Sequence, residues 1–67
     1  MSELYRGYTI ELLPQRWGYV SEVIDANGSI LWRSEAIAIS KRVAIEHAQK
    51  VIDEVEDTRE ELKRYEP

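Results

Sequence analysis

Residues 17–34 read WGYVSEVIDANGSILWRS, and they decide the fold because they predict a β-hairpin. The two arms, 17–24 and 29–34, are rich in β-branched and aromatic residues, which pack well on a pleated surface. Between them lies Asp25-Ala26-Asn27-Gly28. An Asn-Gly pair between two apolar runs is typical of a hairpin turn, because both residues tolerate a positive φ. We therefore expect two antiparallel strands joined at this turn.

The register of this hairpin has two solutions. A two-residue type I′ turn at the Asn-Gly pair would place Glu22 opposite Arg33. A type I turn that begins at Asp25 and ends in a glycine bulge would instead pair Ile24 with Ile30. Charge pairing favours the first register, and the preference of aspartate for the first position of a turn favours the second. The sequence leaves both open.

A further strand is predicted on the N-terminal side of the hairpin. From Leu4 to Leu13, apolar and polar residues alternate well enough for one face to be buried. Pro14 is expected to end this strand, because proline has no amide hydrogen to give to a ladder. In either register of the hairpin the sheet carries apolar side chains on both faces, and one helix can cover only one of them.

A long amphipathic helix is predicted on the C-terminal side. Residues 36–39 read AIAI and suit either an extension of the third strand or the start of the helix. Ser40 is a good N-cap, since its hydroxyl can accept from the free amides of the first turn. One apolar stripe follows at three- and four-residue spacing, formed by Ala44, Ile45, Ala48, Val51, Ile52 and Val55.

These elements predict one α+β domain over residues 1–67, a three-stranded antiparallel sheet of β-β-β meander topology packed on one long C-terminal helix. The expected bounds are about 4–13, 17–24 and 29–34 for the strands and 41–65 for the helix. Such a helix would be roughly 37 Å long, whereas strands of about seven residues span roughly 23 Å. The last turns of the helix should therefore extend beyond the sheet.

The composition disfavours several kinds of site. The chain has no cysteine and one histidine, His47, so disulfides, thiolate metal sites and zinc sites are not expected. It also lacks a glycine-rich phosphate loop and a nucleophile paired with a base, so we expect no enzyme, no cofactor and no metal. No signal-peptide pattern or membrane-length apolar run is present, and we expect a cytoplasmic protein.

The net charge is −4, and the acidic excess lies in the last fifteen residues. This excess disfavours general binding to nucleic acids or anionic membranes. A domain of this size buries only about 60% of the surface of its unfolded chain, and oligomerisation is a common remedy. The sequence thus predicts a non-enzymatic protein-interaction module that is a homodimer or docks on a larger protein. The candidate interface residues are Trp17, Tyr19, Trp32, Val55, Leu62 and Tyr65.

The alternative function is nucleic-acid binding through the start of the helix and an arginine–aromatic sheet face. Its candidate contacts are Arg16, Arg33, Lys41 and Arg42. The segment Ser40-Lys41-Arg42-Val43-Ala44, followed by Ala48, resembles the start of the last helix of double-stranded-RNA-binding domains. That resemblance implies that Lys41 and Arg42 contact phosphates, although Ile45 stands where the family has its third lysine.

A broader resemblance covers most of the chain. The motifs are Gly7-Tyr8-x-Ile10, Gly18-Tyr19, Asp25-x-Asn27-Gly28 and Ala44-x-x-x-Ala48-x-x-x-Ile52-Asp53. In this order they look like those of small uncharacterised bacterial β-β-β-α proteins. The resemblance implies the fold and brings no activity with it.

Overall fold

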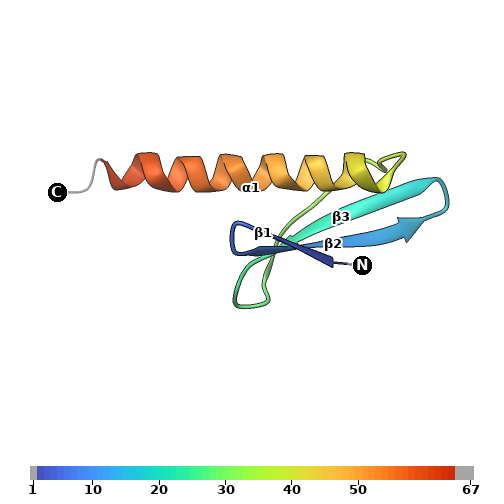
Figure 1. Cartoon of the computed structure of the whole chain (residues 1–67), viewed down its shortest axis with the longest axis horizontal. Helices are drawn as coiled ribbons and strands as arrows, with labels where there is room; N and C mark the ends of the chain where they lie inside the picture. The colour runs from blue at the N-terminus through green and yellow to red at the C-terminus, as the bar shows by residue number, and fades with distance from the viewer. Residues whose placement is uncertain (1, 65–67) are drawn as a thin grey trace.

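The computed structural model describes residues 2–64 and has four strands and one helix in that range. The elements are β1 (Ser2–Tyr5), β2 (Tyr8–Gln15), β3 (Gly18–Ile24), β4 (Ile30–Arg33) and α1 (Lys41–Lys63). The strands form one antiparallel sheet in the order β1-β2-β3-β4, and α1 lies along one face of it (Figure 1). The predicted α+β class is confirmed, but the sheet has four strands instead of three.

The single strand predicted for residues 4–13 is wrong, because the chain reverses direction within it. The residues between β1 and β2 are Arg6, with φ 50°, and Gly7, with φ 86°. Two positive φ values define a type I′ turn, whose twist suits antiparallel strands. A positive φ is uncommon for arginine, and an ion pair of 2.9 Å with Asp53 of α1 holds the Arg6 side chain.

The prediction that Pro14 ends the strand of residues 4–13 is also wrong. β2 continues past Pro14, and the turn to β3 lies at Arg16 and Trp17, so Trp17 is outside the strand. Pro14 is opposite Tyr19, whose backbone N–H and C=O bond to Ala38 on the other side. The β2–β3 ladder therefore needs no hydrogen bond from the backbone nitrogen of residue 14, so proline is tolerated there.

The turn between β3 and β4 is the type I turn that begins at Asp25. The Asp25 carbonyl accepts from the N–H of Gly28 at 3.0 Å, and its carboxylate accepts from the N–H groups of Asn27 and Ser29, both at 2.9 Å. Gly28 has φ 86°, which fits the glycine bulge of the second predicted register.

A β-bulge reconciles the two predicted registers. Next to the turn Ile24 pairs with Ile30, as the second register predicts, while farther along Glu22 pairs with Arg33, as the first predicts. The shift leaves Leu31 as the extra residue on β4. Each alternative was therefore correct for one part of the hairpin.

Residues 36–39 form neither of the two predicted structures. Ala38 makes an isolated bridge with Tyr19, with two backbone hydrogen bonds of 2.8 Å. Gly18 makes this approach possible, since a Cβ at that position would lie 2.0 Å from the carbonyl oxygen of Ala38. The segment between β4 and α1 is thus fastened to the edge of β3.

Helix α1 begins as the sequence predicts. The Ser40 hydroxyl accepts from the N–H of Val43 at 3.2 Å and caps the first turn. The helix ends at Lys63, with Arg64 as its C-cap, and the predicted end at Tyr65 lies outside the described residues. Its 23 residues span about 34 Å, and its C-terminal part runs beyond the sheet (Figure 1), as predicted.

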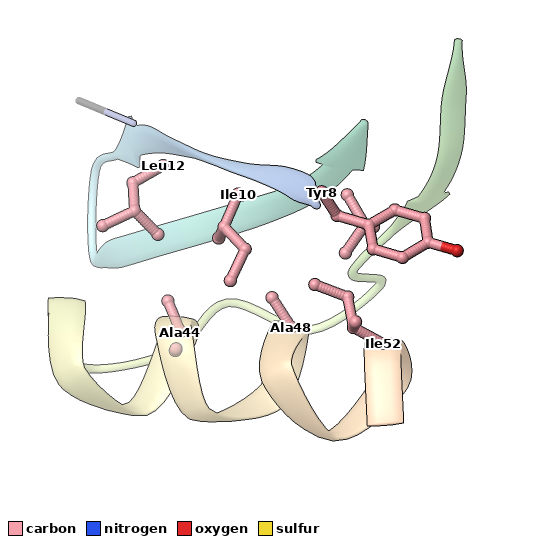
Figure 2. Packing of buried hydrophobic residues seen from close by; sticks show 8 residues of the cluster. Tyr8, Ile10, Leu12, Ala44, Ala48 and Ile52 are labelled. Atoms are coloured by element: carbon pink, nitrogen blue, oxygen red, sulfur yellow. The ribbon is translucent and has the colours of Figure 1, made fainter. Parts of the chain in front are cut away.

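The core lies between α1 and the strands β2 and β3, and side chains of β2 and α1 point at one another (Figure 2). The buried apolar residues are Tyr8, Ile10, Leu12, Val23, Ala38, Ala44, Ala48 and Ile52. On α1 they recur every fourth residue, and two of the three are alanine. These short side chains let the helix backbone lie close to the sheet.

We predict that Gly18→Ala lowers the free energy of unfolding by roughly 2–4 kcal/mol, because the added methyl group meets the Ala38 carbonyl and φ is +155°. Gly7→Ala is the matched control. It has φ +86° but no atom within 4 Å of the added Cβ, and should cost only about 1 kcal/mol. Urea unfolding followed by circular dichroism measures both, and equal losses would contradict the role assigned to the Gly18–Ala38 approach.

Candidate interaction surfaces

Large apolar side chains are exposed where the β2–β3 turn meets the start of α1. Trp17 is 76% exposed, Ile39 85% and Ile37 47%. The Tyr19–Ala38 bridge explains the two isoleucines, since an extended segment that buries Ala38 turns its neighbours outward. We call Trp17, Ile37 and Ile39 the turn-end surface.

Two cations border the turn-end surface. The Arg16 guanidinium lies 5.4 Å from the ring centroid of Trp17, and the Lys41 Nζ lies 5.8 Å from that of Tyr19. Both distances are within the range of cation–π attraction. This end of the molecule is therefore aromatic and basic.

The C-terminal part of α1 carries the second set of exposed apolar residues. The last buried residue of the helix is Ile52, and Leu62 is 60% and Val55 36% exposed. We call residues 53–63 the overhang. Trp17 and the overhang belong to opposite ends of the helix, so the candidate interface residues do not form one surface (Figure 1).

Hydrogen bonds from the first hairpin hold the start of the overhang. The Tyr5 hydroxyl and the Arg6 guanidinium both donate to Asp53 Oδ1, at 2.8 and 2.9 Å. The Tyr8 hydroxyl donates to Glu56 Oε1 at 2.5 Å. We call these contacts the polar latch, which ties β1 and β2 to the helix where the core ends.

The polar latch shifts the pKa values of its members. The hydrogen bond from Arg6, followed by that from Tyr5, holds the pKa of Asp53 below its ordinary 3.8. The hydrogen bond from Tyr8 holds the pKa of Glu56 below its ordinary 4.5. The same bonds raise the pKa values of Tyr5 and Tyr8, because ionisation would remove the donated proton.

A groove of about 460 Å³ lies between the sheet turns and the overhang. Its apolar lining includes Leu31 of the bulge and Val55, and its charged lining includes Arg6, Glu56 and Arg59. Glu56 and Arg59 are 3.5 Å apart and bind each other. The groove thus joins an apolar wall to a polar wall that is already paired.

The sheet face opposite the helix is mixed in character. Arg33 Nε lies 2.9 Å from the Glu22 carboxylate, and Glu22 is only 7% exposed. Leu4 and Ile30 lie on the same face and are 78% and 60% exposed. The predicted apolar second face is therefore interrupted by an ion pair.

The remaining predicted site residues are dispersed over the molecule. Trp32 and Tyr19 are half-buried and pack against the core. Arg42 binds Glu46 at 3.2 Å, and Arg33 lies on the open sheet face, away from Lys41. Tyr65 is outside the described residues. Sequence reasoning missed Ile37 and Ile39, although the alternation of residues 36–39 was a signal for them.

Within residues 2–64 no three histidine or acidic side chains gather in a way that could hold a metal ion. His47 is exposed on α1. In the same range, no helix has both the length and the apolar character of a membrane span.

Comparison with known proteins gives no relative. No family model, curated protein or solved structure matches the chain. The resemblances noted for the sequence therefore remain predictions.

We predict that the polar latch makes stability depend on acidic pH. Because the pKa values of Asp53 and Glu56 are lower in the folded chain, their contribution is complete above the ordinary values and is lost as pH falls below about 4.5 through the folded values. Urea midpoints from pH 7 to 3 measure this loss. Tyr8→Phe removes the bond to Glu56 and should flatten the profile, and an unchanged profile would contradict the role of the Tyr8–Glu56 bond.

Proposed function

We propose that the protein is a non-enzymatic protein-interaction module that works as a homodimer. The main support is the large area that the chain exposes to solvent. The chain exposes 5160 Å², whereas a monomeric protein of 7.9 kDa has about 4400 Å². The radius of gyration is 13.1 Å and the value for a compact chain of this length is about 11 Å. Both values show that the chain is more extended than a compact protein of its size, which leaves surface available to a partner.

The exposed apolar side chains support the same proposal. Trp17, Ile39 and Leu62 are each more than half exposed to solvent. Aromatic and large aliphatic side chains of this kind are concentrated in the centres of interfaces. A second copy or a larger protein would remove them from water. The absence of cysteine leads us to place this module in the cytoplasm.

Sedimentation equilibrium over a wide range of micromolar concentrations tests the homodimer. Trp32→Phe leaves Trp17 as the one tryptophan, so that its emission reports on coverage of the turn-end surface. We expect a reversible dimer, with Trp17 emission that is red in the dilute chain and shifts to the blue when a partner covers it. The Trp32 change conserves most of the packing, and circular dichroism checks that the variant folds.

Two results would contradict the proposal. A chain that stays monomeric over the whole range would exclude the homodimer. A monomer whose Trp17 emission is already fully blue-shifted would also exclude docking on a larger protein through this surface, since Trp17 would then be covered within one chain.

The alternative function is nucleic-acid binding, favoured by the position of Arg16 beside the exposed Trp17 ring and of Lys41 beside the Tyr19 ring. Bases stack on such rings while cations bind phosphates. If this function holds, Lys41→Glu/Arg42→Glu should abolish salt-sensitive retention of single-stranded DNA or RNA. Lys63→Glu/Arg64→Glu is the control, because it makes the same charge change at the other end of α1. Absence of retention by the wild-type chain would exclude this alternative.

A further inference from the structure

We propose that two copies of the chain associate through the β4 side of α1, with their helices antiparallel. The inference rests on the proposed homodimer and adds which surface forms it. Val51, Val55 and Leu62 follow one another at four and seven residues, so they share one side of the helix. We call this side the apolar flank.

Contacts on the other side of the helix locate the apolar flank. Asp53 binds Tyr5 and Arg6, so the side of α1 that carries Asp53 faces β1. Val51 and Val55 are each two residues from Asp53, which places them about 200° around the helix from it. Together with Glu54 and Thr58 they line a hollow that residues of α1 alone form. The polar latch thus occupies the β1 side of α1, while the apolar flank lies on the side of β4 and is partly open to solvent.

The charges beside the apolar flank select the partner and its direction. Lys50 and Glu54 are exposed, and the ion pairs of the described residues 2–64 include neither of them. In an antiparallel pair centred near residue 52, Lys50 of each copy lies level with Glu54 of the other. The attraction between Lys50 of one copy and Glu54 of the other is then made twice. Parallel helices would place like charges level with one another, so the charge pattern favours an antiparallel second copy.

The apolar contacts agree with the same arrangement. Val51 and Val55 of the two copies meet at the centre. At about 1.5 Å per residue, Leu62 of one copy reaches the start of the other helix, close to the exposed Ile39. Because the arrangement has two-fold symmetry, the assembly ends at two chains. Each overhang then packs on the other copy, since its own sheet does not extend beneath it.

Charge reversal tests the arrangement. Lys50→Glu and Glu54→Lys each turn two attractions into two repulsions, and each should raise the dimer Kd about tenfold or more in sedimentation equilibrium. The double variant Lys50→Glu/Glu54→Lys should restore the wild-type Kd. An equimolar mixture of the two single variants should form a heterodimer, because every introduced charge then faces an opposite one.

The mixture separates the dimer contact from effects within one helix. Lys50 and Glu54 also lie four residues apart in the same chain, where they interact weakly, but mixing changes no chain. Leu62→Glu should abolish the dimer, and Leu4→Glu, which makes the same change on the open sheet face, should not. Circular dichroism of each variant at low concentration confirms folding.

The results distinguish this inference from the proposed function. The antiparallel arrangement is contradicted if both single charge variants leave the dimer Kd unchanged. It is also contradicted if Leu4→Glu disrupts the dimer and Leu62→Glu does not. In both cases the proposed homodimer still stands. A wild-type chain that is monomeric at every concentration contradicts both.

Discussion

The packing of α1 on β2 and β3 is the contact on which the rest of the structure depends. Ala44, Ala48 and Ile52 bury one side of the helix, and the core ends with Ile52. The helix nevertheless continues to Lys63. Isolated helical segments shorter than about 12–15 residues are marginal in water. Within one chain, the overhang therefore depends on the polar latch on its β1 side.

The sequence predicted the elements whose signals are local and agree with one another. The turn after β3, the Ser40 cap and the apolar stripe of α1 were all recognised, because each rests on neighbouring residues. The first hairpin was missed since its turn needs a positive φ at Arg6, which arginine rarely adopts. The residue is held by Asp53, a partner far along the chain that no local pattern reveals. Pro14 was misjudged for a similar reason, because its tolerance depends on where the backbone of Tyr19 points.

The candidate surfaces were less predictable than the fold because they depend on single-residue shifts. Strict alternation would put Ile30 and Trp32 on one face of the sheet. The bulge at Leu31 instead places these two residues on opposite faces. Ile30 pairs with Ile24 on the open face, and Trp32 pairs with Val23 on the side of the helix. Trp32 is consequently half-buried against the core.

The two sides of α1 differ in how far their chemistry is satisfied within one chain. On the β1 side, the carboxylates of Asp53 and Glu56 accept hydrogen bonds from the first hairpin, so both have partners within the chain. On the β4 side, Val55 and Leu62 are exposed, with Glu54 unpaired among the described residues. This asymmetry is the basis of our proposal that a second copy approaches α1 from the side of β4.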